Sequence, residues 1–193
     1  AMAQQGNENL SLQVDSIMKQ ITEENNVPGA ILSIVKADST LLVSGYGVQE
    51  IKSKKAVDPT ESLFRIGSVT KNITALALMQ LVEKGKIDLY GDANDYLVSY
   101  QLKNEYERKI TPYDLITHTA GLDNHLLGVQ SRDFLDPEDL APHVIKQFPD
   151  QIRQPGEVQL YSSYGTALIA VMIQDVTGML FNDYVQENIF DPL

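Results

Sequence analysis

The sequence predicts a mixed α/β fold in which a β-hairpin near the N-terminus precedes a mainly helical region. Residues 30–35 form a short apolar run typical of a buried strand, and residues 40–48 supply an antiparallel partner across a polar turn. Beyond residue 58, apolar residues recur at helical spacing. We therefore expect an N-terminal helix and hairpin over residues 1–58 and a mainly helical region over residues 59–193.

The expected helices follow from apolar spacing and from residues that favour helix ends. Residues 9–24 have the pattern of an amphipathic helix, and residues 69–84 are apolar nearly all round, which predicts the most buried helix of the chain. Pro112 is expected to begin a short helix capped by Thr111. The remaining expectations are a loop over 52–62, one or two short helices over 137–148 interrupted at Pro142, a helix over 164–177 closed by Gly178, and a short helix over 181–188.

The composition excludes several classes of function. Among 193 residues, 15 Lys+Arg stand against 26 Asp+Glu, and the net charge of −11 disfavours a surface that binds nucleic-acid phosphates. The absence of cysteine excludes disulfides and cysteine-ligated zinc. No apolar run approaches the roughly 20 residues of a membrane-spanning helix. The opening Ala-Met-Ala is typical of a cloning remnant, which is compatible with a removed targeting segment.

The predicted sheet is too small to be stable by itself. We expect only two strands, both before residue 50, and an isolated hairpin is marginally stable in water. Either the hairpin lies on helices alone, or strands outside this sequence complete its sheet. The second explanation is favoured, so the two parts are expected to form one incomplete structural unit.

The motif Ser-x-x-Lys occurs three times, and the context distinguishes the copies. In this motif a serine hydroxyl attacks a carbonyl while a lysine one helical turn away takes its proton. The copy at Ser33 and Lys36 lies on a predicted strand, where residues three apart point to opposite faces. The copy at Ser16 lies on a surface helix, where Lys19 is expected to be hydrated and charged, and therefore a poor base.

Ser68 and Lys71 form the copy that its context favours as catalytic. They lie at the start of the apolar helix, on one face of it, where free backbone N–H groups suit an oxyanion. The alternative is that Ser68 only caps the helix, although a capping box places Glu or Gln, not Lys, three residues later. These residues alone leave the two alternatives evenly matched.

Tyr161 is the second candidate, because residues 155–165 (PGEVQLYSSYG) deliver it just before an apolar helix. A phenol at such a place can shuttle a proton when a neighbouring ammonium lowers its pKa. For this segment taken alone, the favoured alternative is a packing tyrosine, with Ser162 or Ser163 capping the helix.

Six blocks in order resemble the serine β-lactamase/penicillin-binding-protein-like family, in the branch of class C β-lactamases, D-Ala-D-Ala carboxypeptidases, D-aminopeptidases and related esterases. The resemblance covers residues 27–193 and implies the N-terminal portion of a serine β-lactamase/DD-peptidase-like fold. In that fold the hairpin joins three C-terminal strands of a central antiparallel sheet, and these strands are missing here. The blocks are residues 64–71, 80–89, 110–122 (ITPYDLITHTAGL), 155–165, 176–178 and 188–193.

The resemblance implies roles for four residues. Ser68 corresponds to the acylated nucleophile, Lys71 to its base, and Tyr161 to the first residue of the family's Tyr-x-Asn element, which assists proton transfer. Ser163 stands where the family usually has an Asn that binds the substrate amide, so Ser163 is implied as a shorter substrate-binding substitute. The family's third motif, Lys/His-Thr/Ser-Gly, lies further downstream and carries the second backbone N–H of the oxyanion hole.

The implied function is a serine hydrolase that cleaves amide or ester bonds through an acyl-enzyme, with a D-Ala-D-Ala peptide or a β-lactam as substrate. The alternative is a catalytically incompetent fragment or pseudo-enzyme that acts as a binding module. Its hairpin edge would then recruit a second chain or a second copy of this one. By resemblance, the protein is expected outside the cytoplasm, either secreted, periplasmic or at the cell surface.

No cofactor, metal, nucleic-acid partner or membrane span is expected. The three histidines, His118, His125 and His143, lack the spacing of metal ligands. His118 falls in a block where the family's histidine is structural. Asp123, Asn124 and His125 are candidates for the rim of the cleft.

Overall fold

The structure is a computed structural model that describes residues 2–123 and 140–193. It contains two compact units, Ala1–Arg65 (unit 1) and Ile66–Leu193 (unit 2). Within the described residues there are six α-helices and a three-stranded antiparallel sheet, which confirms the predicted α/β class.

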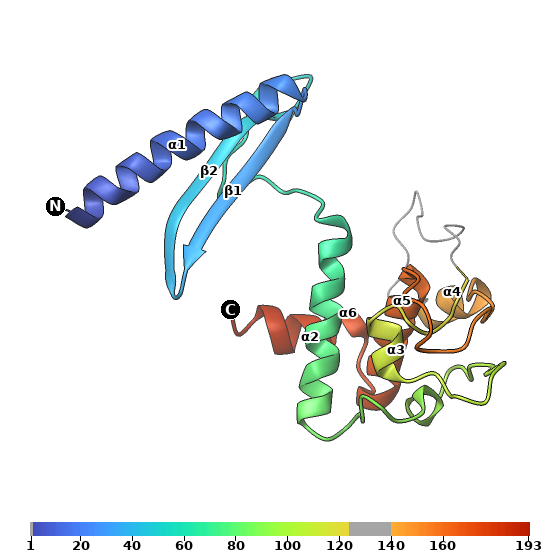
Figure 1. Cartoon of the computed structure of the whole chain (residues 1–193). Coiled ribbons are helices and arrows are strands. Elements are labelled where there is room, and N and C mark those ends of the chain that lie inside the picture. Colours follow the sequence, from blue (N-terminus) through green and yellow to red (C-terminus); the bar gives the residue numbers. More distant parts are fainter. Residues whose placement is uncertain (1, 124–139) are drawn as a thin grey trace. The chain divides into compact units, whose positions relative to one another are not determined.

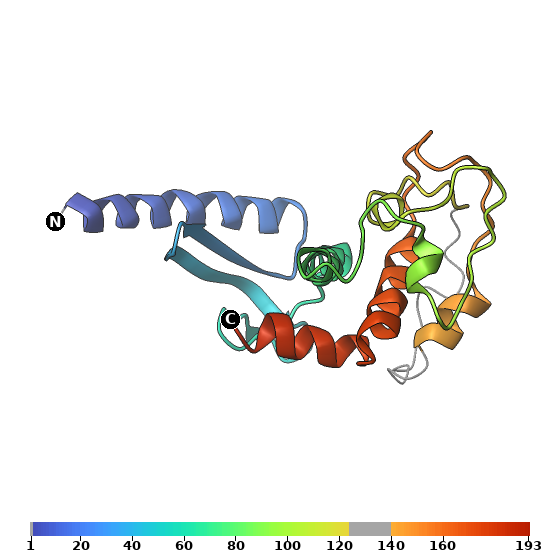
Figure 2. The same cartoon turned by 90° about the horizontal axis from the view of Figure 1, so that it is seen from below.

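Unit 1 is a long helix laid along a β-hairpin (Figures 1 and 2). The helix α1 (Met2–Glu24) contacts β2 (Ser39–Glu50), which pairs antiparallel with β1 (Gly29–Lys36). The Tyr46 hydroxyl of β2 donates to the Asp15 carboxylate of α1 at 2.7 Å. Tyr46 is buried and Asp15 is partly exposed, so this partly buried bond fastens the helix to the sheet.

A third strand corrects two of the expectations, a loop over 52–62 and a sheet of only two strands. The strand β3 (Lys55–Ala56) pairs antiparallel with β2, and Ala56 lies opposite Val48. The chain reverses after Glu50 through a turn in which Lys54 takes a φ of 59°. A strand of two residues is too short to show the alternating pattern of a strand in its sequence. It is recognised only by its pairing with β2.

Unit 2 packs its helices around one deeply buried helix (Figure 1). That helix is α5 (Ser163–Thr177), and nine of its 15 residues are buried. Helices on several sides contact it, namely α2 (Thr70–Glu83), α3 (Pro112–Ile116), α4 (Leu140–Lys146) and α6 (Phe181–Val185). The shorter elements are the 3₁₀ turns Gly67–Val69 and Ala93–Tyr96 and the π-helical turn Gln186–Phe190.

The helix α2 is less buried than the sequence predicts. Four of its 14 residues are buried, whereas Leu76 and Met79 are 47% and 46% exposed. The expectation that this is the most buried helix is therefore wrong, and α5 holds that place among the described residues. Apolar residues on every side of a helix predict that the helix is buried. They do not predict which of its faces other elements of the structure actually cover.

Polar contacts stabilise the start of the short helix α3, which lies just before His118 in the chain. Thr111 accepts the Asp114 N–H at 3.1 Å, and the Asp114 carboxylate accepts the Thr111 N–H at 3.0 Å. This reciprocal pair is a capping box, so the predicted cap and first helical Pro112 are both confirmed. Arg108 donates to the same buried carboxylate at 3.0 Å.

The other predicted helix boundaries hold in part. Gly178 closes α5 with a left-handed φ of 70°, as predicted. The helix α4 passes through Pro142 without interruption, which corrects the expected break. Pro142 lies in the first turn, where an N–H has no helical partner to lose. Residues 137–139 of that expected segment lie outside the described residues.

Among the described helices, none has by itself the length and apolar character to cross a membrane. The helix α5 and residues 181–190 meet those requirements only as a pair that is bent by 84°.

Candidate active site

Ser68 lies at the entrance of α2, as predicted. It is in the middle of the 3₁₀ turn Gly67–Val69, which continues directly into the helix, and it is exposed. Gly67 takes a φ of 53°, a conformation that residues with a side chain rarely adopt. The N-cap position of α2 belongs to Val69, without a side-chain cap, so Ser68 is not the capping residue of the alternative interpretation.

Lys71 follows within the first turn of α2 and reaches back to the serine. Its Nζ donates a hydrogen bond to Ser68 Oγ at 3.3 Å, and the side chain is partly buried. The two residues therefore share one face of the helix, as their spacing predicts.

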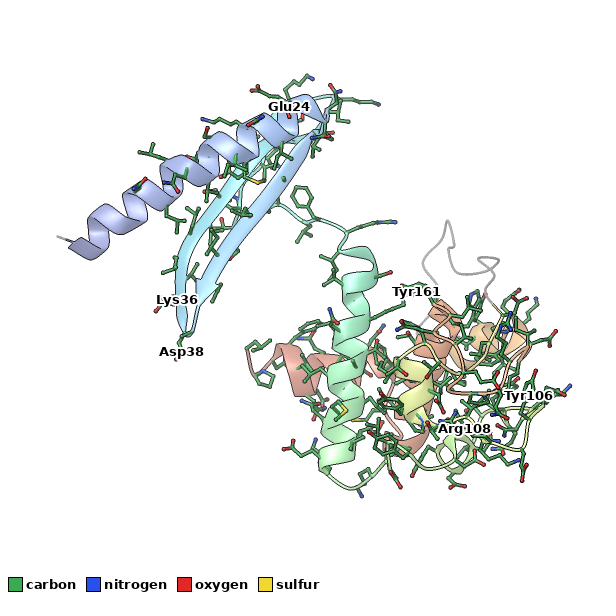
Figure 3. All side chains as sticks on the ribbon, viewed as in Figure 1. Glu24, Lys36, Asp38, Tyr106, Arg108 and Tyr161 are labelled. Carbon is green, nitrogen blue, oxygen red and sulfur yellow. The ribbon has the colours of Figure 1, made fainter. Side chains whose placement is uncertain are left out.

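Tyr161, whose side chain is labelled in Figure 3, completes the group from a segment 93 positions away. Its hydroxyl lies 2.6 Å from Ser68 Oγ, and either oxygen is able to donate in this bond. Lys71 Nζ lies 5.0 Å from the centre of the phenol ring. The structure thus brings together the three side chains that sequence reasoning selected, all of them within unit 2.

The surroundings of Tyr161 lower the pKa of its phenol below the ordinary value of 10.0. Hydrogen bonding with the Lys71 amine is the largest cause, and the hydrogen bond with Ser68 is the second. The positive charge of Lys71 and the Ser163 hydroxyl act in the same direction, while burial opposes them. A phenol in this environment gives up its proton more readily than a free tyrosine does.

Ser162 and Ser163 take different places at the start of α5. Ser162 is buried and caps the helix, since its Oγ accepts the Gly165 N–H at 3.2 Å. Ser163 is the first residue of the helix, and its hydroxyl acts on the Tyr161 phenol as described above. The capping part of the alternative interpretation is therefore correct for Ser162, whereas substrate binding by Ser163 stays a prediction.

His118 contacts Tyr161, although sequence reasoning gave it a structural role. The two rings lie 4.5 Å apart, centre to centre, with an angle of 44° between their planes. His118 Nδ1 accepts the Ser162 N–H at 3.3 Å, and the His118 carbonyl accepts the Leu160 N–H at 2.8 Å. Nothing in the local pattern around His118 indicates a contact that spans more than 40 positions.

The other copies of Ser-x-x-Lys lie in unit 1 and are built differently. Ser33 and Lys36 lie on β1, as predicted. Ser16 and Lys19 lie on α1 with both side chains exposed, which confirms the expected surface position.

The remaining candidates are simply located. Within the described residues, no three His, Asp or Glu side chains are arranged to hold a metal ion. His143 lies in the last turn of α4. The Asp123 N–H donates to the Asp150 carbonyl at 2.8 Å. Asn124 and His125 lie outside the described residues, so their expected place at the rim stays a prediction.

Comparison with known proteins identifies the family. The model of the Beta-lactamase family matches residues 14–193, which is most of the chain. The chain belongs to the beta-lactamase family. Its resemblance to β-lactamases and penicillin-binding proteins is thereby confirmed.

Named relatives agree with this assignment. The chain is 27% identical over 185 residues to Protein flp of Staphylococcus aureus strain MRSA252, covering 94% of this chain and 36% of that protein. It is 25% identical over 183 residues to Penicillin-binding protein 4* of Bacillus subtilis strain 168, covering 93% of this chain and 39% of that protein. The chain therefore spans little more than a third of the length of these curated relatives.

A solved structure gives the same result for the fold. The octameric penicillin-binding protein homologue from Pyrococcus abyssi superposes with a TM-score of 0.76 at 27% identity. The match covers 93% of this chain and 42% of that one. The chain thus has the predicted fold of the family, over less than half of that protein's length.

Proposed function

We propose that this chain carries the nucleophilic half of a serine hydrolase that works through an acyl-enzyme on Ser68. The observation that supports it is the contact of Ser68 Oγ with both Tyr161 Oη, at 2.6 Å, and Lys71 Nζ, at 3.3 Å. A serine hydroxyl is a weak nucleophile until an adjacent group takes its proton, and here two such groups converge on one oxygen.

The hydrogen bonds suggest how the proton leaves. In one form Lys71 is charged and the Tyr161 oxygen is deprotonated. Charged Lys71 has no lone pair to accept a hydrogen bond, so it donates to Ser68 Oγ, and the serine proton is directed at the Tyr161 oxygen. The same net charge results from a neutral Lys71 beside a protonated Tyr161. The two side chains hold one proton between them in either case, and in that form they act together as the general base.

The bond changes follow from this arrangement. Ser68 Oγ attacks the carbonyl carbon of an amide or ester, and its proton passes to the Tyr161–Lys71 pair. The pair then protonates the leaving nitrogen or oxygen as its bond to the carbonyl carbon breaks, which leaves the acyl group on Ser68. Water, deprotonated by the same pair, then attacks the acyl carbon; the bond from that carbon to Ser68 Oγ breaks, the pair returns the proton to Ser68 Oγ, and the acid product leaves.

The substrate class belongs to the same proposal. A D-Ala-D-Ala peptide or a β-lactam suits the family, and the names of the relatives include a penicillin-binding protein. Ser163 begins α5, and its hydroxyl acts on the Tyr161 phenol, so we propose that it binds the substrate amide beside Tyr161. An extracytoplasmic location is proposed on the same family grounds.

Intact-mass measurement after exposure to a fluorophosphonate and to a fluorescent penicillin tests the proposal. With the fluorophosphonate, Ser68 Oγ bonds to phosphorus, fluoride leaves, and the mass rises by one phosphonyl group. We expect this adduct in the chain and in Ser16→Ala, and none in Ser68→Ala. An adduct that survives Ser68→Ala, or no adduct from either reagent, would overturn the assignment of Ser68.

A further inference from the structure

Tyr161 is a half-exposed side chain on a segment without regular structure, so something must hold it in place. The residue is 45% exposed and precedes the first turn of α5. Exposed side chains on irregular segments sample several rotamers. A hydrogen bond as short as 2.6 Å to Ser68 therefore requires a support for the phenol ring.

His118 provides contacts on both sides of Tyr161. Its carbonyl accepts the N–H of Leu160, the preceding residue, at 2.8 Å. Its Nδ1 accepts the N–H of Ser162, the following residue, at 3.3 Å. Between these two bonds the imidazole lies against the phenol ring at 4.5 Å. One residue thus fixes the backbone before and after Tyr161 and supports the ring itself.

The backbone of His118 is in a conformation that most residues avoid. Its φ is 61°, and it directly follows Thr117, the C-cap residue of α3. Glycine or asparagine is usual at such a position, and other residues occupy it at a cost of about 1 kcal/mol or more. If the turn alone mattered, glycine would serve better, so the imidazole is the part of His118 that this position requires.

The contacts also define the protonation state of the ring. Accepting an N–H at Nδ1 requires a lone pair there, so the imidazole is neutral with its proton on Nε2. Burial is the first cause that lowers the pKa of His118, and the charge of Lys71 on α2 is the second. Both causes favour the form that holds the Ser162 N–H.

We propose that His118 is the positioning residue of the site, and that it holds the Tyr161 phenol on Ser68 through its Nδ1 bond to Ser162 and its contact with the ring. This inference rests on the proposed function, in which Tyr161 takes part in proton transfer from Ser68. His118 itself does not touch the reacting atoms.

The test compares two substitutions at position 118 with one elsewhere. His118→Gly keeps the left-handed backbone and removes the imidazole. His118→Asn also suits that backbone, and its Oδ1 lies where Nδ1 was, so it restores the acceptor without a titrating ring. His143→Asn, on α4, is the matched histidine control.

Two measurements are made on each variant of the 193-residue chain, together with its melting temperature. The first is the rate of fluorophosphonate labelling at Ser68. The second is the pH titration of the Tyr161 phenol by NMR of protein containing [¹³Cζ]tyrosine, in which Tyr161→Phe assigns the resonance. The second measurement does not depend on catalysis.

We expect His118→Gly to slow labelling by about tenfold or more, because a small displacement of a proton-transfer group is costly. In the same variant the Tyr161 titration should move up toward the ordinary value near 10, since the phenol leaves Lys71 and Ser68. His118→Asn should restore most of both properties, and His143→Asn should change neither.

Two results would overturn the inference. One is a folded His118→Gly variant with unchanged labelling and an unchanged Tyr161 titration. The other is a slower labelling rate in both position-118 variants that is fully explained by their lower melting temperatures. If the wild-type chain is not labelled but the Tyr161 titration moves in His118→Gly and returns in His118→Asn, positioning holds while the proposed function fails.

Discussion

The same four-residue motif occurs on α1 of unit 1 and at the entrance of α2 in unit 2, and the two copies have different surroundings. On α1, Ser16 and Lys19 are exposed side chains on an outer helical surface. At α2, Ser68 receives Lys71 from its own helix and Tyr161 from a segment 93 positions away. Helical spacing brings the serine and lysine onto one face in both copies. The difference lies in the third side chain, which only the tertiary fold supplies.

This comparison shows what a short motif contributes to a site. Spacing places two functional groups within reach of each other, but it does not change their chemistry. The chemistry changes where Lys71 lowers the pKa of Tyr161 while both contact the same serine oxygen. The predictions below treat the α1 copy as an internal control for the α2 copy.

The largest effect is expected from the lysines. Lys71→Met removes the positive charge and one half of the Tyr161–Lys71 base, so labelling of Ser68 by a fluorophosphonate should slow by about a thousandfold, equivalent to about 4 kcal/mol in the barrier. Lys19→Met changes the matching lysine on α1 and should leave the rate unchanged. Equal rates in the two variants would contradict the role of Lys71.

A smaller effect is expected from the phenol. Tyr161→Phe keeps the ring against His118 but removes the oxygen that contacts Ser68, so labelling should slow by about a hundredfold. Tyr90→Phe alters an exposed tyrosine that stacks on Tyr113 and serves as its control. If Tyr161→Phe were labelled like the wild type, the lysine alone would be the base.

The pH dependence of labelling is the next prediction. The base must be free to accept the serine proton, so the rate should fall about tenfold per pH unit below the pKa of the Tyr161 phenol and level off above it. Because the pKa of Tyr161 is lowered from 10.0, chiefly by Lys71, the midpoint should lie below 10. A stopped-flow labelling profile measures it, and a midpoint at or above 10 would show that Lys71 does not act on the phenol.

Local signals located the parts of this site, and the resemblance of six ordered blocks to a known family selected them as catalytic. The turn before α2, the lysine three residues on, and the tyrosine before α5 are each marked by neighbouring helix boundaries. Capping of α3 by Thr111 was predictable for the same reason, since caps depend on residues close in the chain.

The features that sequence reasoning missed depend on distant contacts. The two residues of β3 form a strand only because β2 passes beside them. The exposed Leu76 and Met79 follow from which neighbours reach α2, and that is a property of packing. His118 combines a left-handed backbone with a contact to Tyr161, and neither leaves a periodic pattern in the chain.

The smallest effect is expected in unit 1. Tyr46→Phe removes the partly buried bond to Asp15 and should lower the stability of the α1 contact by about 1 kcal/mol, measured as faster amide hydrogen exchange in α1 and β2. Burial and the Asp15 carboxylate raise the pKa of Tyr46 above 10.0, so this contribution persists through neutral pH and is lost only as pH rises through the raised pKa. Labelling of Ser68 should not change, since every side chain assigned to the site lies in unit 2. Slower labelling in this variant would show that unit 1 affects the reactivity of Ser68. The contact with Tyr161 would then not be the whole reason why the α2 copy of the motif differs from the α1 copy.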